Sequence, residues 1–430
     1  MITTCFVNIW GKRVGALAWD NETGLGSFEY DPAFLTSKLD LAPIQMPIEG
    51  ANGRIFTFSE TRNNTTFKGL AGLLADVLPD RYGNAIINAW LNRQGRLSNS
   101  LNPIEMLCFI GNRGMGALEF EPINPKTENK ASKIELSGLI EIADDILSGR
   151  KDFSTKIEQD EEKALHDILK IGTSAGGARA KAVIAYNPKT NEVRSGQTDA
   201  PKGFTHWLIK FDGVTDKQFG TSSGYGRVEM AYHLMAVDAG IEMTECKLLE
   251  ENGRAHFMTR RFDREADNSK LHIQTFCALR HYDYNEVTLY SYEDLFETMR
   301  YLGLPYPQAE QLYRRMVFNV MGRNCDDHTK NFAFVMDKSG KWQLAPAYDV
   351  CHAYRPNSEW VSQHALSING KRKDITKTDL LNVAKQMNIK KAESIINHIS
   401  EVIINWENYA EKVNLELPLK EAIQKTLIVF

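Results

Sequence analysis

The chain has 430 residues, 43% of them hydrophobic and 25% charged, which is the composition of an ordinary globular protein with two or three lobes. Its 51 basic and 55 acidic residues give a formal net charge of −4, which excludes the overall positive field typical of nucleic-acid-binding proteins. We see no signal peptide, no run of about 20 apolar residues and no CxxC pair among the six cysteines, so we expect a cytoplasmic protein with reduced thiols and no membrane span.

The first part of the chain is predicted to be a small β-rich unit. Apolar and polar residues alternate over 4–32, and polar or glycine-containing breaks at 11–12 and 20–24 are typical of hairpin turns. Residues 67–91 change to a helical period, with a break at Pro79-Asp80. A short helix and a strand are expected within 104–121, and the polar segment 124–135 is a predicted linker.

A second β-rich unit is predicted after a helical stretch over 138–171. We expect strands at 180–187, 205–212, 246–253 and 254–262, and a helix over 228–240 that ends at Gly240. Beyond Asp263 the pattern is mostly helical, with helices expected at 292–302, 307–322, 377–386, 390–412 and 419–429. The chain is therefore predicted to have an α+β fold in three parts: a β-rich N-terminal subdomain (1–123), a mixed α/β lobe (124–262) and a mostly helical C-terminal lobe (263–430).

The stretch NCDDHTKNF (324–332) places two carboxylates, an imidazole, an amine and an amide within nine positions. Asp326 and Asn331 are five residues apart, which is the spacing between the catalytic base and the metal-binding amide of protein kinases. Asp349, in LAPAYDV, adds a third oxygen donor after a predicted hairpin with 338–340 at its tip, and the corresponding kinase aspartate holds magnesium. Without Asp349 and this hairpin, a capped and solvated loop would explain Asp326 and Asn331 equally well.

The other polar residues of this stretch have less defined roles. His328 either orients the loop through a hydrogen bond or packs against the helical lobe, and a structural role is the preferred interpretation. Asp327 is expected to be a surface carboxylate, because two buried neighbouring carboxylates would repel each other. Lys330 would meet either the transferred phosphoryl group or solvent.

Two features of the front half suit the binding of phosphates. The segment IGTSAGGARAK (171–181) has small residues that let backbone N–H groups approach a phosphate, but it matches no standard phosphate loop, and a plain turn is the alternative. Lys210, in HWLIKFD, has apolar neighbours that place its ammonium beside a buried surface. Glu229 is its candidate partner, as in the lysine–glutamate pair of active kinases, and a strand-edge lysine reaching solvent is the alternative.

Together these stretches resemble the HipA-type serine/threonine kinases, the toxins of bacterial type II toxin–antitoxin modules. DDHTKNF followed by LAPAYDV is similar to the catalytic signature of that family, TSAGGARAK to its phosphate-binding loop and HWLIKF to its ATP-lysine strand. TRRFDR (259–264) resembles its hinge between the lobes, and FKGLAGLLADVLPDRYG (67–83) its N-terminal subdomain. The resemblance implies a two-lobed, protein-kinase-like fold and an ATP- and magnesium-dependent protein serine/threonine kinase.

The resemblance also implies roles for the matching residues. Asp326 would be the catalytic base, and Asn331 and Asp349 would hold magnesium. The residues implied to bind ATP are Ser174, Ala175, Gly176, Gly177, Ala178, Lys181, Lys210, Arg260, Phe262 and His328, together with Asn331 and Asp349. Ser174 stands where similar proteins have a serine whose autophosphorylation expels the loop and inactivates the kinase. Two positions depart from the pattern, since Ala180 and Arg260 stand where members of the family often or sometimes have glutamate.

The family also implies partners: a HipB-like DNA-binding antitoxin and a protein substrate, with aminoacyl-tRNA synthetases as substrates associated with the family. No direct nucleic-acid contact and no membrane are expected. One alternative is a catalytically weak kinase-fold corepressor that acts with a DNA-binding antitoxin. Another is a metal-dependent hydrolase that uses Asp326, Asp327 and His328 as ligands.

Overall fold

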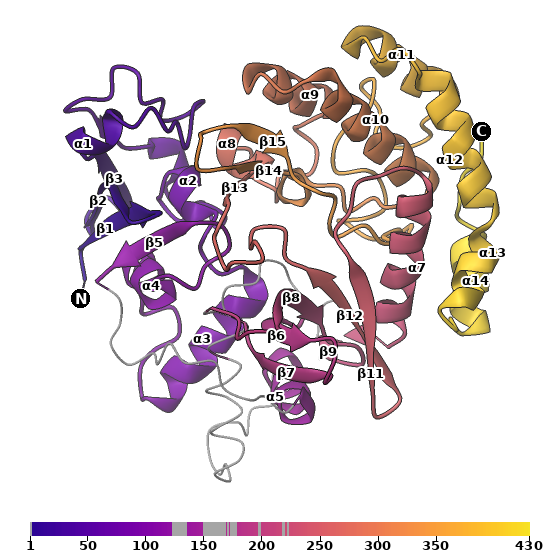
Figure 1. The fold of residues 1–430 in the computed structure, drawn as a ribbon, viewed down its shortest axis with the longest axis horizontal. Helices are drawn as coiled ribbons and strands as arrows, with labels where there is room; N and C mark the ends of the chain where they lie inside the picture. Colours follow the sequence, from indigo (N-terminus) through magenta and orange to yellow (C-terminus); the bar gives the residue numbers. More distant parts are fainter. Residues whose placement is uncertain are drawn as a thin grey trace. The chain divides into compact units, whose positions relative to one another are not determined.

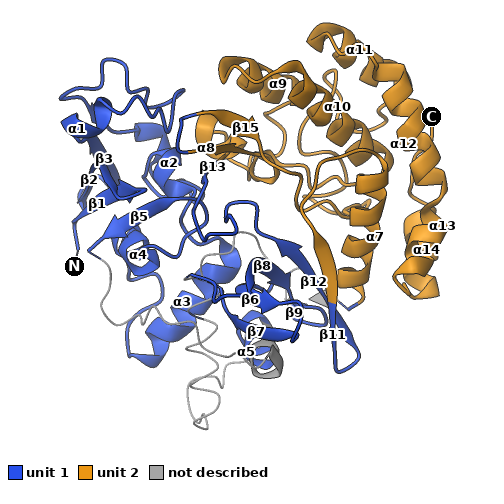
Figure 2. Ribbon diagram, viewed as in Figure 1, with its two compact units in different colours: residues 1–223, 249–273, 338–340 blue, residues 224–248, 274–337, 341–430 orange. Residues whose placement is uncertain are grey.

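The computed structural model describes residues 2–122, 136–148, 169, 172, 179–196, 199–216, 220–221 and 223–430 (Figure 1). Two compact units make up the chain (Figure 2). Unit 1 consists of Met1–Ser223, Leu249–Ile273 and Lys338–Gly340, and unit 2 of Gly224–Leu248, Gln274–Asp337 and Lys341–Phe430. The predicted linker at 124–135 lies outside the described residues, as does most of 149–178.

Unit 1 begins with a sheet whose strand order is β4-β3-β2-β1-β5. Its strands are β1 (Thr4–Ile9), β2 (Lys12–Asp20), β3 (Leu25–Tyr30), β4 (Ile55–Phe56) and β5 (Leu118–Glu121). The two predicted hairpins are confirmed, because β1 pairs antiparallel with β2, and β2 with β3. Gly11 and Gly24 lie in these turns with φ of 74° and 67°, a left-handed backbone that glycine adopts without steric cost.

Short helices complete this part of unit 1. They are α1 (Pro32–Leu35), the 3-10 turn η1 (Ser59–Thr61), α2 (Gly72–Ala75), α3 (Arg81–Arg93) and α4 (Pro103–Ile110). The helical prediction over 67–91 is confirmed only in part. Lys68 and Gly69 have left-handed backbone (φ 50° and 79°), which no α-helix can contain, and Pro79 separates α2 from α3.

The second sheet has the strand order β11-β12-β8-β6-β7. Its strands are β6 (Lys181–Asn187), β7 (Glu192–Ser195), β8 (Thr205–Lys210), β11 (Cys246–Glu251) and β12 (Arg254–Arg260), so all four predicted strands are confirmed with slightly shorter ends. A short pair, β9 (Thr215–Asp216) and β10 (Gly220–Thr221), and helix α5 (Leu136–Ser148) lie in the same unit.

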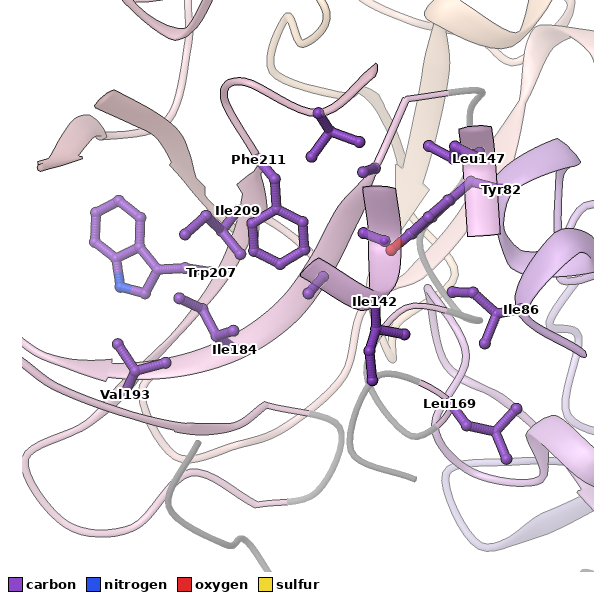
Figure 3. Close-up of a cluster of buried hydrophobic side chains, with 14 of the residues drawn as sticks. Tyr82, Ile86, Ile142, Leu147, Leu169, Ile184, Val193, Trp207, Ile209 and Phe211 are labelled. Atoms are coloured by element: carbon purple, nitrogen blue, oxygen red, sulfur yellow. The ribbon is translucent and has the colours of Figure 1, made fainter. Parts of the chain in front are cut away.

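One face of this sheet is covered by a hydrophobic cluster (Figure 3). Trp207 and Ile209 are two positions apart on β8, so they face the same side of the sheet and belong to this cluster. Tyr82 and Ile86, one turn apart on α3, and Ile142 of α5 also belong to it. Burial of each such side chain contributes roughly 1.5–3 kcal/mol. Since successive strand residues face opposite sides, the cluster directs Lys210 to the other face of the sheet.

Unit 2 is mostly helical. Its elements are α7 (Tyr225–Asp238), α8 (Phe276–Arg280), α9 (Tyr292–Tyr301), α10 (Tyr306–Met321), η3 (Thr329–Asn331), β14 (Ala333–Met336), β15 (Trp342–Leu344), α11 (Lys377–Met387), α12 (Ala392–Ile404), α13 (Trp406–Lys412) and α14 (Leu417–Gln424). Strand β13 (His272–Thr275) crosses the boundary between the units. The helix predicted over 390–412 is divided at Asn405, and the last helix ends five residues earlier than predicted. Across the described ranges, no helix combines the length and the apolar character that crossing a membrane requires.

Candidate active site

The polar stretch 324–332 starts directly at the end of the buried helix α10. Arg323 has left-handed backbone (φ 55°) and turns the chain away from the helix axis. The N–H of Asn324 then donates to the carbonyl of Asn319 at 2.9 Å, and the N–H of Cys325 donates to the carbonyl of Ala353 at 3.0 Å. These bonds fix the start of the stretch to the helix end on one side and to the chain around Ala353 on the other.

Asp327 is buried, so the prediction of a surface carboxylate was wrong. Its Oδ1 accepts a hydrogen bond from the N–H of Ala365 at 2.8 Å. Its Oδ2 accepts one from the hydroxyl of Tyr292 at 2.8 Å and lies 2.8 Å from Nδ1 of His364. The prediction assumed that burial of Asp327 would bury Asp326 too and make the two carboxylates repel each other. Instead, the side chain of Asp327 is 0% exposed whereas that of Asp326 is 51% exposed, so only one of the two carboxylates is buried.

The surroundings of Asp327 form a charged and fully buried network. Burial alone would lower the pKa of His364, but the carboxylate of Asp327 raises it to about 10, so the imidazole is charged at neutral pH. Burial and the same carboxylate raise the pKa of Tyr292 well above its usual value, which keeps the hydroxyl protonated as a donor. Sequence reasoning missed both partners, which lie 37 and 35 positions from Asp327 with no local pattern to indicate them.

A short 3-10 turn, η3, positions the amide of Asn331. Nδ1 of His328 accepts a hydrogen bond from the N–H of Lys330 at 3.2 Å and so caps this turn, as the orienting interpretation of His328 expects. Nδ2 of Asn331 donates to the backbone carbonyl of Asp326 at 2.6 Å, which makes Oδ1 the end of the amide that points elsewhere. The candidate base and the candidate metal-binding amide are thus tied together directly.

The loop that carries Asp349 follows the predicted hairpin. β14 and β15 pair antiparallel, with Lys338–Gly340 between them, so the hairpin prediction is confirmed. Asp349 has φ of 52°, a left-handed conformation that aspartate tolerates better than most residues. The preceding Tyr348 donates its hydroxyl to the carbonyl of Lys330 at 2.6 Å, which ties this loop to η3.

Asn331 and Asp349 line the same small cavity, whose volume is about 20 Å³. An amide oxygen and a carboxylate are the oxygen donors that magnesium prefers, so these residues fit such an ion. The residues around the cavity are Ile241, Arg315, Asn319, Asn324, Asp327, Asn331, Phe332, Ala347, Tyr348, Asp349 and Val350.

The alternative hydrolase site is not supported by this geometry. Its three ligands would have to converge, but the carboxylate of Asp327 is bound to His364 and Tyr292, whereas Asp326 is exposed and 3.8 Å from Nε2 of His328. Within the described part of the chain, no group of three or more histidine, cysteine, aspartate or glutamate side chains is placed to hold a metal ion.

In unit 1 the two candidate phosphate-binding lysines are cross-strand neighbours. Lys181 of β6 lies directly opposite Lys210 of β8 in an antiparallel pair, so both side chains leave the same face of the sheet, away from the hydrophobic cluster. Lys181 is buried, and Nζ of Lys210 lies 5.8 Å from the ring centroid of Phe257. The sheet therefore brings the two predicted lysines to the same face, and their binding of phosphates stays a prediction.

The remaining predicted residues lie at the end of β12 or outside the described residues. Arg260 is the last residue of β12, opposite Trp207, and Phe262 lies two residues further along the chain; both are half-buried. Glu229 is buried in α7 of unit 2, so its pairing with Lys210 would join the two units and stays a prediction. Ser174, Ala175, Gly176, Gly177 and Ala178 lie outside the described residues.

Comparison with known proteins identifies two family domains in the chain. The HipA N-terminal domain matches residues 6–121, and the HipA-like C-terminal domain matches residues 173–406. A protein named "Putative kinase Y4mE" from Sinorhizobium fredii (strain NBRC 101917 / NGR234) is 23% identical over 377 residues, which cover 81% of this chain and 77% of that protein.

Two solved structures are also similar. HipA of Shewanella oneidensis MR-1, in a complex with HipB and operator DNA, matches with a TM-score of 0.65 and 18% identity over 98% of this chain and 94% of that chain. The Helicobacter pylori proinflammatory kinase CtkA matches with a TM-score of 0.34 and 15% identity over 58% and 92% of the two chains. The predicted α+β fold of the HipA type is confirmed by the first match. Because its two domain matches together cover most of the sequence, the chain belongs to the HipA family.

Proposed function

We propose that the protein is an ATP- and magnesium-dependent protein serine/threonine kinase. The observation that carries the proposal is the arrangement of three residues from one loop system in unit 2. Asn331 and Asp349 line one cavity, and the amide of Asn331 is bonded to the backbone of Asp326, whose carboxylate is half exposed. Cation ligands must face a common space, and a base must be reachable by the substrate hydroxyl.

In the proposed reaction each residue has a defined task. The carboxylate of Asp326 accepts the proton of a serine or threonine hydroxyl, while the hydroxyl oxygen bonds to the γ-phosphorus of ATP and ADP leaves. Lys181 and Lys210 contact the phosphates through their ammonium groups. Asn331 and Asp349 would hold the magnesium ion, which would neutralise phosphate charge when bound.

The proposal includes regulation and partners. Ser174 is the proposed autophosphorylation site, and its modification would displace the loop at 173–178 and stop transfer. A HipB-like antitoxin is the proposed partner, because the structure of the Shewanella HipA contains HipB and operator DNA. The proposed substrates are proteins such as aminoacyl-tRNA synthetases. The corepressor alternative would need a weakened site, whereas Asp326, Asn331 and Asp349 are all present.

The test is incubation of the purified protein with labelled ATP and magnesium in a cell lysate, followed by identification of the labelled proteins. Asp326→Ala should lower transfer by roughly 100- to 10,000-fold, the usual contribution of a general base, while ATP binding persists. A second variant, Asp349→Asn, removes the charge of the proposed magnesium ligand and should lower transfer. Asp374→Asn is its matched control, because Asp374 is exposed in the same unit and has the same φ of 52°. Transfer at the wild-type rate by Asp326→Ala would show that the base is assigned wrongly.

A further inference from the structure

The cavity beside Asn331 and Asp349 contains two buried polar atoms that the proposed reaction leaves unexplained. Oδ1 of Asn324 and Nε of Arg315 make no hydrogen bond to any part of the chain that the structure describes. Both residues line the cavity, and they are only 4% and 5% exposed. An unsatisfied buried polar atom costs about 1–3 kcal/mol, so an acceptor and a donor on two residues that line one cavity indicate that the cavity binds a polar molecule.

The orientation of the Asn324 amide follows from a chain of hydrogen bonds that ends at Asp327. A carboxylate accepts, so the hydroxyl of Tyr292 donates to it, and the Tyr292 oxygen accepts from Nδ2 of Asn319 at 2.9 Å. Oδ1 of Asn319 then accepts from Nδ2 of Asn324 at 3.0 Å. Each hydrogen bond therefore fixes the orientation of the next amide. Because Nδ2 of Asn324 donates to Asn319, Oδ1 of Asn324 is the atom that takes no part in these bonds.

Arg315 contributes the opposite hydrogen-bonding character. It lies one helical turn before Asn319 on α10, so the two side chains share a face of the helix. Its Nη2 donates to the carbonyl of Ala345 at 2.7 Å, which fixes the guanidinium and leaves Nε–H as a donor without an acceptor in the described part of the chain. A positive guanidinium disfavours a bare cation at this point, whereas a water molecule can accept from Nε–H and donate to Oδ1.

The size of the cavity agrees with a single water molecule. Its volume of about 20 Å³ exceeds the roughly 10–15 Å³ that one water requires, and buried waters usually make about three hydrogen bonds. The lining residues include Arg315 with its Nε–H donor, Asn324 with its acceptor oxygen, and Asp349, which carries a carboxylate.

We propose that this cavity binds one water molecule and that Asn324 and Arg315 are positioning residues for Asp349. The water accepts from Nε–H of Arg315, donates one hydrogen to Oδ1 of Asn324 and donates the other to the carboxylate of Asp349. This bond holds Asp349 in the orientation in which it shares a divalent cation with Asn331. The cation role rests on the proposed function, whereas the water site does not.

The experiment compares Asn324→Leu, Arg315→Lys and the control Arg314→Lys in the full-length protein. Leucine keeps the branched shape but removes both the oxygen and the Nδ2 donor to Asn319, and lysine keeps the charge but has a methylene in place of Nε. Arg314 is the neighbour on α10 and also donates to a backbone carbonyl, that of Ala239 at 3.2 Å. Three results are needed: Mn²⁺ binding in the presence of ADP, followed by electron paramagnetic resonance; the thermal midpoint of unfolding of each variant; and a high-resolution crystal structure of the wild type.

The crystal structure is expected to contain a water bonded to Asn324 and Arg315. Asn324→Leu and Arg315→Lys should weaken Mn²⁺ binding by roughly 10- to 100-fold, the usual effect of removing a group that orients a metal ligand, and Arg314→Lys should not. A merely structural role would lower the thermal midpoint without changing Mn²⁺ affinity, which would overturn the proposal.

Two further results would also overturn it: a wild-type cavity without water density, or Mn²⁺ bonded directly to Oδ1 of Asn324 in place of the water. If Asn324→Leu does not fold, Arg315→Lys decides. A wild type that binds no Mn²⁺ with ADP would refute the proposed function instead, and the electron density would still decide the water site.

Discussion

Replacement of Asp327 by asparagine should destabilise unit 2 strongly, although the residue is not placed in the reaction. The side chains of Asp327 and His364 are 0% and 1% exposed, and their 2.8 Å contact is a buried ion pair. Asparagine preserves the shape, but it removes the charge that compensates His364 and turns an N–H₂ group toward existing donors. Removal of one partner of a buried ion pair costs about 3–5 kcal/mol.

The pKa of His364 gives a second estimate of the same interaction. Burial lowers the pKa, but Asp327 raises it from 6.5 to about 10. Because the pKa is higher in the folded state, the stabilisation is fully present below about pH 6.5 and is lost as the pH rises through 10. At about 1.4 kcal/mol per pKa unit the interaction is worth roughly 4–5 kcal/mol, of which roughly half is lost between pH 7 and pH 9.

The assay follows urea unfolding through Cys325, whose buried thiol lies in the same loop and becomes reactive when the loop opens. Labelling is measured by mass spectrometry at pH 7 and at pH 9. The difference in unfolding free energy between wild type and Asp327→Asn should shrink by roughly 2–3 kcal/mol at the higher pH. Asp379→Asn is the control, because Asp379 is a buried carboxylate bonded to Lys371 at 2.9 Å. Within the described chain its side-chain donors are Lys371, Thr376 and Asn369, with no histidine among them, so its effect should be equal at both pH values. An equal effect of Asp327→Asn at both pH values would refute the ion-pair reasoning.

Three further predictions concern the proposed reaction. Lys210→Met and Lys181→Met should each weaken ATP binding about 10- to 100-fold in calorimetric titration, because a charge-assisted hydrogen bond contributes about 1.5–3 kcal/mol, whereas exposed Lys189→Met should bind ATP normally. Ser174→Ala should abolish the phosphate that intact-mass and peptide analysis find on ATP-treated protein; a phosphate on another residue would refute the assignment. Asp349→Asn should keep the thermal midpoint but lose magnesium-dependent transfer, measured with labelled ATP at increasing magnesium concentration.

Local patterns in the sequence were sufficient to predict much of the fold. The strands at 181–187 and 205–210 were predicted from their β-rich composition and turn boundaries, and the β14–β15 hairpin from its apolar alternation and the glycine-containing tip. Asp326 and Asn331 were found because their spacing reflects one short loop. Each of these features depends on residues that are close together in the chain, and such residues leave a local pattern in the sequence.

Features that depend on distant residues could not be predicted in this way. The burial of Asp327 depends on Tyr292 and His364, and neither has a recognisable spacing from it. The break at Asn405 between α12 and α13 interrupts a sequence without proline or glycine, so the period alone favoured one continuous helix. In both cases tertiary contacts decide between conformations that the local sequence permits equally.

The opposite environments of Asp326 and Asp327 have a common cause. Three hydrogen-bond donors hold the carboxylate of Asp327 in the core, and the chain on either side is fixed by the bond from Cys325 to Ala353 and by η3. With the backbone fixed at both ends, burial of one carboxylate leaves the neighbouring one half exposed, where a substrate hydroxyl can reach it. The buried aspartate therefore sets the direction of the proposed base, so loss of its charge should impair transfer even though it never contacts the substrate.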